Sequence, residues 1–376
     1  MSGMKTIVVK VGTSTLTQGK PYLSRPSILE LVRQLAAVQS MGYRVLLVSS
    51  GAMAAGREVL SGQTLSSALP TKQMLCAIGQ GQLMRLYSDL FGLYGVRVGQ
   101  VLVTGEDLLR HRTRYLNARD TLNMLLEYQT IPIINENDTL AVDEIKVGDN
   151  DNLSALIASL INADLLLILT DRDGLYNKDP RRYPDAHPIE VVHRLDAQIQ
   201  AMASGVSSSG QGIGGMATKL QAAEVAGRSG IETVIANGST RDVILRIVQG
   251  EALGTRFAPT APRVESRKRW LLSELPQGVV QVDEGATAAL RQRAASLLPV
   301  GIRNVEGQFP RGAVVLVRDL AGQKVAHGLV NYGAEELVRL CGVKSDQIET
   351  TLGYSYGTEA IHRDNMAIFK EVPDEH

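Results

Sequence analysis

Short apolar segments alternate with longer amphipathic ones over the first two thirds of the chain, and this alternation limits the possible folds. The short segments are almost continuous in Val, Ile and Leu, which is typical of strands buried on both faces of a parallel sheet. The longer ones repeat apolar residues at helical spacing, as in ILELVRQLAAVQ. We therefore predict an α/β three-layer sandwich, an architecture in which helices cover both faces of a central, mostly parallel sheet. The predicted strands are TIVVKVG, RVLLVSSG, VRVGQVLVTG, TIPIINEND, ADLLLILTD and IETVIANG.

The pattern changes near residue 260. Residues 260–275 begin with the Pro- and Arg-rich TAPRVESRKRW and are predicted to be a linker. Beyond them the segments shorten and turn residues become denser, with strands expected in VVQVDEG, AVVLVRD and KVAHGLVNY. Two domains are therefore predicted, residues 1–259 and a small β-rich domain over residues 276–376.

Composition excludes several classes of function. Lys and Arg together number 39, as do Asp and Glu, so the net charge is zero, which argues against a general electrostatic grip on nucleic acid or membrane. Cys76 and Cys341 are far apart and fit neither a zinc site nor a disulfide framework. No segment approaches the roughly 18 apolar residues of a membrane span, and no signal peptide is evident. We expect a cytoplasmic protein.

Small and polar residues follow the predicted strands. Because the carboxyl ends of parallel strands share one edge of a sheet, these residues are expected to border a single cleft. They are Lys10, Gly12, Thr13, Ser14, Ser49, Ser50, Gly51, Ala52, Asn135, Glu136, Asn137, Asp138, Thr170 and Asp171.

The segment IKVGDNDNLSAL places Asp149, Asn150, Asp151 and Asn152 together before an apolar helical run. Asp and Asn are good helix N-caps, so simple capping is one interpretation. A helix start needs only one cap, however, and a helix N-terminus also offers partial positive charge and free N–H donors. The alternative interpretation is a polar binding cluster at the start of this helix.

A second candidate is the Gly-rich segment SSSGQGIGGMATK, residues 207–219. Its letters match the dinucleotide-binding motif G-x-G-x-x-G, but that motif requires a strand directly before it, and none is predicted here. The segment is also not a P-loop, because a P-loop has Gly-Lys-Ser/Thr, whereas here Thr218 precedes Lys219. A flexible loop remains possible. Glycines nevertheless let backbone N–H groups approach a phosphate, and Lys219 could cover its charge.

Two lysines, a Gly-rich loop and an Asp/Asn cluster without a histidine base suit phosphoryl transfer to a carboxylate. A carboxylate has a pKa near ~4, so it needs no general base. The remaining tasks are positioning and charge neutralisation. Asp151 could hold Lys10 and Lys219 in place. Asn150 could bind an amino-acid substrate, with Asp149 or Asp138 at its ammonium and Ser50 at its carboxylate.

Several motifs together closely resemble the glutamate 5-kinases of the amino-acid kinase family. They are VVKVGTS, SSGAMAAGRE, NARDTL, PIINENDT, EIKVGDNDNLSAL, LLLILTDRDGLYNKDPR and GIGGMATKLQAA. The tail, with VDEGATAAL, SLLPVGI and AHGLVNY, resembles a PUA domain. The resemblance covers nearly the whole chain in order.

The resemblance implies that ATP, with Mg²⁺, phosphorylates L-glutamate to L-glutamyl 5-phosphate, the first step of proline biosynthesis. It also implies feedback inhibition by proline and a homo-oligomer, a dimer or tetramer. The catalytic residues would be Lys10, Lys219 and Asp151, and the glutamate-binding residues would be Ser50, Gly51, Asp138, Asp149 and Asn150. The ATP-binding residues would be Lys10, Gly12, Thr170, Asp171, Ile213, Gly214, Gly215, Met216, Ala217, Thr218 and Lys219. The direct magnesium ligands stay open.

Two departures and two rival interpretations accompany this resemblance. Ile213 and Ser49 stand where the family commonly has threonine, and the loss of a hydroxyl at Ile213 could change the affinity for ATP.

A different member of the family could act on aspartate, acetylglutamate or a nucleoside monophosphate, although the Gly-Asp-Asn-Asp-Asn segment and the PUA-like tail argue against it. PUA domains often bind RNA, but the zero net charge and the 4% aromatic content make RNA an unfavoured partner.

Overall fold

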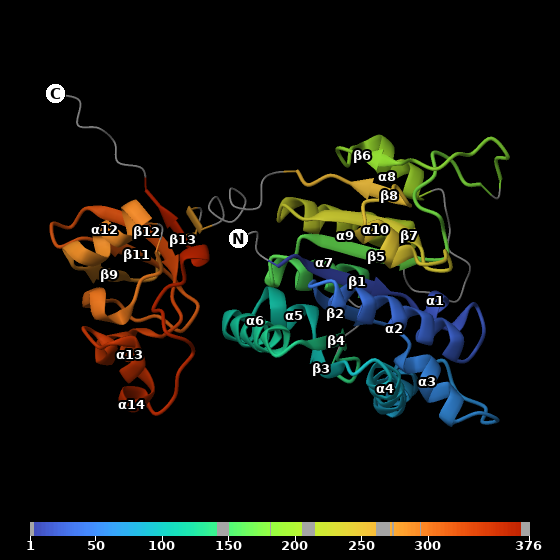
Figure 1. Cartoon of the computed structure of the whole chain (residues 1–376), viewed down its shortest axis with the longest axis horizontal. Helices are drawn as coiled ribbons and strands as arrows, with labels where there is room; N and C mark the ends of the chain where they lie inside the picture. The colour runs from blue at the N-terminus through green and yellow to red at the C-terminus, as the bar shows by residue number, and fades with distance from the viewer. Residues whose placement is uncertain are drawn as a thin grey trace. The chain divides into compact units, whose positions relative to one another are not determined.

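The computed structural model describes residues 4–140, 150–180, 182–204, 215–260, 271–272, 274–293 and 295–369. The chain forms two compact units, which are drawn in Figure 1 and described separately below. The predicted linker falls mostly in residues 261–270, outside the described part of the chain, so the domain limits at residues 259 and 276 stay a prediction.

The larger unit contains an eight-stranded sheet in the order β3-β4-β2-β1-β5-β7-β8-β6. Its strands are β1 (Thr6–Val11), β2 (Arg44–Ser49), β3 (Arg97–Val103), β4 (Thr130–Glu136), β5 (Leu165–Thr170), β6 (Val191–Val192), β7 (Glu232–Asn237) and β8 (Thr255–Phe257). All neighbouring strands are parallel except β7 and β8, which are antiparallel. This confirms the predicted mostly parallel sheet and its six long strands. The sequence did not predict β6 and β8.

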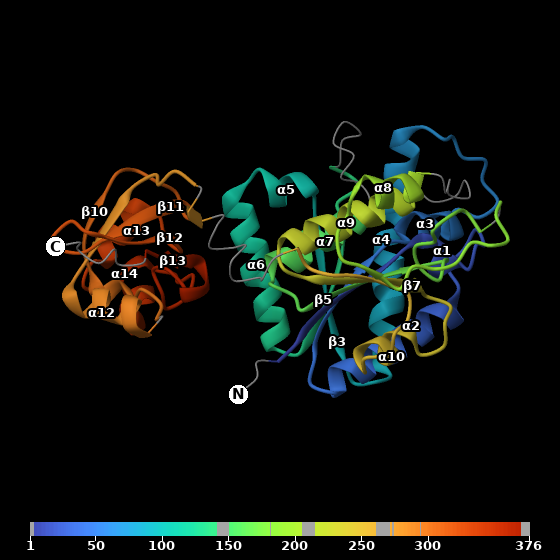
Figure 2. The same ribbon diagram turned by 90° about the horizontal axis from the view of Figure 1, so that it is seen from above.

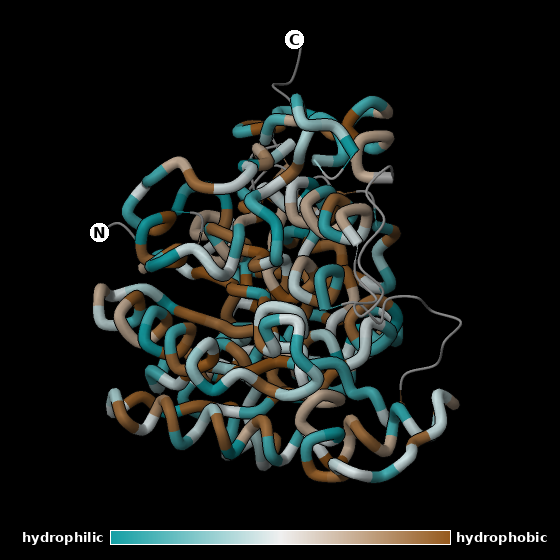
Figure 3. Tube along the Cα trace, turned by 90° about the vertical axis from the view of Figure 1, so that its right-hand side faces the viewer, coloured by the Kyte–Doolittle hydropathy of each residue, from teal (hydrophilic) through white to brown (hydrophobic). Residues whose placement is uncertain are grey.

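Helices cover both faces of this sheet. They are α1 (Thr13–Thr17), α2 (Arg25–Ser40), α3 (Ala52–Val59), α4 (Leu69–Gly92), α5 (Gly105–Leu109), α6 (Arg112–Glu127), α7 (Asn150–Leu160), α8 (Ala197–Ser204), α9 (Met216–Arg228) and α10 (Val243–Val248). Figure 2 shows α7 and α9 on one side of the sheet and α2 and α10 on the other. Hydrophobic and hydrophilic residues alternate along the helices, as expected when one helix face packs on a sheet (Figure 3).

The alternation of side chains along β1 decides which residue reaches which helix layer. Successive side chains of a strand point to opposite faces of the sheet. Val9 and Val11 belong to the hydrophobic core shared with α2, α4 and α10. Lys10, between them, therefore points to the layer of α7, with which β1 also packs. An apparently misplaced lysine in an apolar strand is thereby directed at the start of α7.

The helices α3 and α4 pack with their backbones almost in contact, because glycine lies at both crossing points. A Cβ atom added to Gly56 would lie 2.0 Å from the carbonyl oxygen of Leu75, and one added to Gly79 would lie 1.8 Å from that of Ala52. This close approach ties α4 to α3, and α3 starts directly after the Ser50-Gly51 turn.

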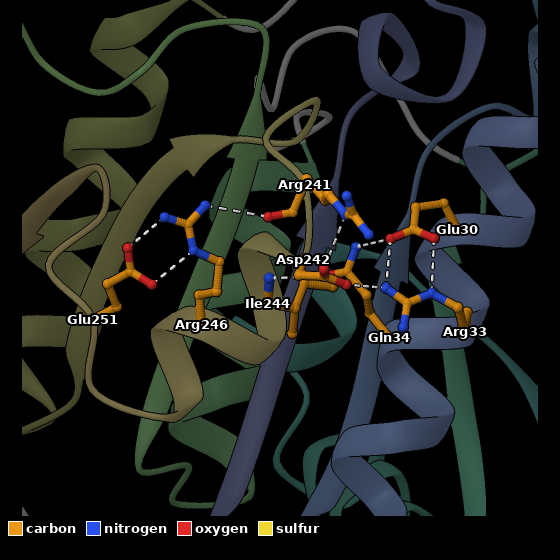
Figure 4. Close-up of polar contacts among 8 residues, drawn as sticks. All are labelled: Glu30, Arg33, Gln34, Arg241, Asp242, Ile244, Arg246 and Glu251. Carbon is orange, nitrogen blue, oxygen red and sulfur yellow. Dashed lines mark hydrogen bonds and ion pairs between the residues drawn. The ribbon is translucent and has the colours of Figure 1, made fainter.

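On the α2 side, a polar network joins α2 to the start of α10 (Figure 4). Arg33 donates to both carboxylate oxygens of Glu30, at 2.8 and 2.7 Å, and is also paired with Asp242. Gln34, which is only 3% exposed, accepts the backbone N–H of Ile244 at 2.8 Å. The network thus holds α10 on α2 through one buried and several partly exposed contacts.

The smaller unit is built on a five-stranded sheet in the order β10-β9-β11-β12-β13. Its elements are β9 (Val279–Val282), α12 (Glu284–Arg293), β10 (Ile302–Glu306), β11 (Val314–Arg318), β12 (Lys324–Leu329), α13 (Ala334–Leu340), α14 (Ile348–Leu352) and β13 (Met366–Ile368), with short 3-10 turns at Pro299–Gly301, Ser345–Gln347 and Arg363–Asn365. Among the strands described in this unit, only β9 and β11 pair in parallel. A separate apolar core surrounds the fully buried Tyr332. The predicted β-rich fold is confirmed, while β10 and β13 had not been predicted.

None of the helices described is both long and apolar enough to span a membrane.

Candidate active site

The candidate site lies at the carboxyl edge of the large sheet, beside β1. From β1 the sheet extends to β2 on one side and to β5 on the other. In open α/β sheets, ligands bind where the strand order changes direction in this way. Thr170 ends β5 at the same edge and Asp171 follows it, with Thr170 Oγ1 3.2 Å from Asp171 Oδ1.

The centre of the site is a buried carboxylate between two buried lysines. Asp151 is 0% exposed, Lys10 4% and Lys219 6%. Lys10 Nζ lies 2.5 Å from Asp151 Oδ1, and Lys219 Nζ lies 3.0 Å from Oδ2. Thr218 Oγ1 also donates to Oδ2, at 2.9 Å. The three charged side chains come from β1, α7 and α9, so only the assembled fold creates this cluster.

The electrostatics of the cluster favour an ionised Asp151. Burial alone would raise the pKa of this carboxyl, but the two adjacent ammonium groups outweigh burial and hold the pKa below its ordinary value. With Asp151 ionised, the three residues carry one net positive charge. Buried positive charge at the carboxyl edge of the sheet is suited to an anionic ligand such as a phosphate. The contacts that the sequence predicted between Asp151 and both lysines are present, while their catalytic roles stay a prediction.

A chain of hydrogen bonds between uncharged side chains borders the cluster. Asn150 Nδ2 donates to Ser50 Oγ at 2.9 Å and to Asn135 Oδ1 at 3.0 Å. Asn135 Nδ2 in turn donates to Gln80 Oε1 at 2.9 Å. We call these four residues the amide chain. The sequence predicted Asn150 and Ser50 as site residues and Asn135 only as a strand-end residue, and it missed Gln80, which lies within the long helix α4.

Gly51 shapes the turn from β2 into α3. Its φ of +106° lies in the left-handed region, and an added Cβ would meet Leu16 Cδ1 at 3.0 Å. Only glycine adopts such a backbone readily. The turn is also fixed by the backbone N–H of Ser50, which donates to Val11 O at 3.1 Å. Together these contacts position the Ser50 hydroxyl at the edge of β1.

Asp138 follows β4 and is held from α4. Gln73 Nε2 donates to the backbone oxygen of Asp138 at 3.1 Å. Burial, together with the charge and hydrogen bonding of the Asp138 carboxylate, raises the pKa of the Cys76 thiol to about 12. Burial also raises the pKa of Asp138, and the bond with the Cys76 thiol opposes this. Cys76 is therefore a hydrogen-bonded thiol beside a predicted substrate-binding carboxylate.

Of the remaining predicted residues, some lie at the starts of helices and the others lie outside the described part of the chain. Gly215 is the N-cap of α9, and Met216, Ala217 and Thr218 form its first turn together with Lys219. Gly12 caps α1, and a Cβ there would come within 3.5 Å of Lys10 Nζ. Asp149, Ile213 and Gly214 lie outside the described residues.

Glu136, the last residue of β4, is a buried acid that the sequence analysis placed among the strand-end residues without giving it a role. It is 7% exposed, and its Oε2 has no hydrogen-bond partner among the residues described. Burial raises its pKa to about 7 from an ordinary 4.5. The backbone N–H of Gly105 opposes this rise, whereas the nearby charges of Asp138 and Asp107 add to it.

We expect Glu136 to make the folded protein less stable as the pH rises from about 4.5 to about 7. In this pH range the Glu136 carboxyl is ionised in the unfolded protein but still protonated in the folded protein. Ionisation therefore stabilises the unfolded state relative to the folded one. The difference in pKa corresponds to about 3 kcal/mol as an upper bound. Urea unfolding should show that Glu136→Gln gains roughly 2 kcal/mol over the wild type between pH 4 and pH 8. The exposed Glu127→Gln should gain nothing, and an equal effect of Glu136→Gln at both pH values would contradict the expectation.

The family models and the curated relatives that match this sequence identify its family. The model of the amino acid kinase family matches residues 5–237, and the PUA domain model matches residues 278–352. Glutamate 5-kinase of Cronobacter sakazakii (strain ATCC BAA-894) is 51% identical over 366 residues, which cover 97% of this chain and 99% of that protein. Glutamate 5-kinase of Yersinia pestis (strain Pestoides F) is 51% identical over 368 residues, which cover 98% and 100%. The solved structure of carbamate kinase from Giardia lamblia bound to AMP-PNP aligns with a TM-score of 0.49 at 20% identity, over 69% of this chain and 99% of that one.

Proposed function

Because the chain belongs to the amino acid kinase family, we propose that it transfers the γ-phosphoryl group of ATP to the side-chain carboxylate of L-glutamate. The products are L-glutamyl 5-phosphate and ADP. The name shared by relatives that are 51% identical over nearly the full length supports this substrate. The observation that carries the proposal in the structure is the buried Asp151 between Lys10 and Lys219.

The reaction requires no general base. An oxygen of the substrate carboxylate, already ionised, forms a bond to the γ-phosphorus, and the bond from that phosphorus to the oxygen bridging to the β-phosphate breaks as ADP leaves. Negative charge on the transferring group and on ADP is then the main obstacle. We assign Lys10 and Lys219 to neutralise this charge and Asp151 to hold both ammonium groups in position. The low exposure of all three residues strengthens these interactions by excluding water.

Binding of the two substrates is assigned to the borders of this cluster. Ser50, Gly51, Asn150 and Asp138 would bind glutamate, with Asp149 alongside. ATP would lie against Gly12, Thr170, Asp171 and the segment from Ile213 to Lys219, where α9 presents its N-terminus to the phosphates. Binding to the start of a helix uses backbone N–H groups, so the isoleucine at position 213 leaves this part of the assignment intact.

Mg²⁺ would be bound mainly by the phosphate oxygens of ATP. Within the described residues no group of three or more His, Cys, Asp or Glu side chains could hold a metal ion. Mg²⁺ keeps several waters and commonly binds through substrate phosphates, so its binding does not require a cluster of protein carboxylates. When bound, Mg²⁺ would neutralise phosphate charge alongside Lys10 and Lys219.

The proposal extends to control and assembly, as the resemblance implies. Proline, the end product of the pathway that the proposed reaction starts, would inhibit at or beside the glutamate site. The active form would be a homo-oligomer, either a dimer or a tetramer.

Acyl-phosphate formation trapped with hydroxylamine tests the proposal. L-glutamate, L-aspartate and N-acetyl-L-glutamate are offered separately with ATP and magnesium, each with and without L-proline. We expect hydroxamate only with L-glutamate, and less of it when proline is present. Hydroxamate with aspartate or N-acetylglutamate but not with glutamate would overturn the assigned substrate, and turnover of glutamate unaffected by proline would overturn the assigned control.

A further inference from the structure

A single backbone group sets the orientation of the whole amide chain. The N–H of Glu136 can only donate, and it lies 2.9 Å from a side-chain atom of Asn135. That atom must be the oxygen Oδ1, so the Nδ2 of Asn135 is the atom that faces Gln80. Since Nδ2 can only donate, the atom of Gln80 that meets it at 2.9 Å is the acceptor Oε1.

The same reasoning runs through the other half of the chain. Asn135 Oδ1 also meets Asn150 at 3.0 Å, and an oxygen acceptor requires the Nδ2 of Asn150 at that point. This Nδ2 also donates to Ser50 Oγ at 2.9 Å. The Oδ1 of Asn150 and the hydroxyl proton of Ser50 therefore take no part in the hydrogen bonds of the amide chain.

The two ends of the amide chain are buried without a partner. Gln80 Nε2 and Asn150 Oδ1 are inaccessible to solvent and have no hydrogen bond within the part of the chain that is described. Buried amide atoms are rarely left unpaired in native proteins, since the loss of their bonds to water is costly. One end is a donor and the other an acceptor. An α-amino acid is complementary to such a pair, because its carboxylate accepts hydrogen bonds and its ammonium donates them.

The position of Gln80 on α4 agrees with this complementarity. Gln73, Cys76 and Gln80 are spaced to share one face of the helix. Gln73 donates to the backbone of Asp138, and the Cys76 thiol lies beside the carboxylate of Asp138, the predicted partner of the substrate ammonium. The unpaired Nε2 of Gln80 thus belongs to the same face of α4 that contacts Asp138, the carboxylate predicted to bind the substrate ammonium.

We propose that Gln80 is a substrate-binding and specificity-determining residue, whose Nε2 donates to the α-carboxylate of the amino-acid substrate. Its Oε1 meanwhile keeps Asn135 and Asn150 oriented for the same substrate. Gln80 would thereby favour acceptors that carry a free α-carboxylate next to the ammonium. This inference rests on the proposed phosphorylation of L-glutamate.

The test compares L-glutamate with L-isoglutamine, its α-amide, which keeps the reactive side-chain carboxylate. Gln80→Glu retains an acceptor for Asn135 but places a negative charge where the α-carboxylate would bind. We expect kcat/KM for L-glutamate to fall on the order of 100-fold, because a carboxylate then faces a carboxylate. L-isoglutamine can donate its amide hydrogens to the new carboxylate, so its kcat/KM should fall by less than about threefold. The KM for ATP should stay within about twofold.

Two further variants complete the test. Gln82→Glu makes the same chemical change at an exposed position of α4 and should leave both substrates unaffected. Gln80→Met removes both hydrogen-bonding ends at similar length and should abolish most of the preference for L-glutamate over L-isoglutamine. Equal losses with both substrates in the Gln80 variants, or no loss, would overturn the role of Gln80 while leaving the proposed function intact. A wild-type protein that forms no product with L-glutamate would instead overturn the proposed function and the inference with it.

Discussion

Replacing Asp151 by asparagine should lower kcat on the order of 10³-fold, with a much smaller change in the KM for either substrate. Asparagine has nearly the same shape but can no longer balance two buried ammonium groups. One of the lysines is then expected to lose its proton or turn away, so charge on the transferring phosphoryl group is no longer neutralised. Steady-state kinetics with L-glutamate and ATP measure this loss.

The stability of the variant has to be measured with its activity. Removing one partner of a buried ion pair commonly costs about 3–5 kcal/mol, so kinetics should be run where circular dichroism shows the variant folded. Glu232→Gln is a matched control, because it removes an ion pair of 2.8 Å with Arg256 at the start of β7, at the opposite edge of the sheet. The control should keep kcat within about twofold. Wild-type turnover by a folded Asp151→Asn protein would refute the role of Asp151.

Replacing Gly79 by alanine should destabilise the larger unit by roughly 3 kcal/mol or more. The added Cβ would lie 1.8 Å from the carbonyl oxygen of Ala52 and 2.3 Å from the backbone nitrogen of Gly56. Backbone atoms of a packed helix cannot turn aside as a flexible side chain can, so α3 and α4 must separate. Because α3 starts at the Ser50-Gly51 turn and α4 carries Gln80, the KM for L-glutamate should also rise.

Gly81→Ala is the control for this second prediction. It lies on the same helix, and an added Cβ there meets nothing within 4 Å. Alanine favours a helix over glycine by about 1 kcal/mol, so this variant should be slightly more stable than the wild type. Urea denaturation of the two variants side by side gives the comparison, and equal stabilities would show that α3 and α4 are not packed as closely as described.

The long elements of the fold were predictable because each carries a strong local pattern. Val, Ile and Leu runs such as LLLILT form strands wherever helices cover both faces of a sheet, and the apolar spacing of ILELVRQLAAVQ predicted the helix α2. The strands β6 and β8 contain only two and three residues, so they carry no periodic signal. Their existence depends on pairing with each other and, for β8, with β7.

The site was predictable where chemistry alone distinguishes a residue. A lysine in the apolar β1 and an aspartate at the start of α7 are unusual enough to be noticed in the sequence, and the structure brings them together at 2.5 Å. Gln80 is different, because glutamine is an ordinary residue on a helix. Its position depends on how α4 is rotated and on the close approach of α3 at Gly56 and Gly79, which no local pattern reveals.

The most direct test of the central claim follows an oxygen atom. L-glutamate labelled with ¹⁸O in its side-chain carboxylate is incubated with ATP, magnesium and hydroxylamine, and the released inorganic phosphate is analysed by mass spectrometry. If the carboxylate attacks the γ-phosphorus, the oxygen that bridges carbon and phosphorus comes from glutamate, and hydroxylamine expels it with the phosphate. We predict one ¹⁸O atom in each phosphate released. Unlabelled phosphate would mean that ATP is hydrolysed without transfer to glutamate, and it would contradict the proposed reaction.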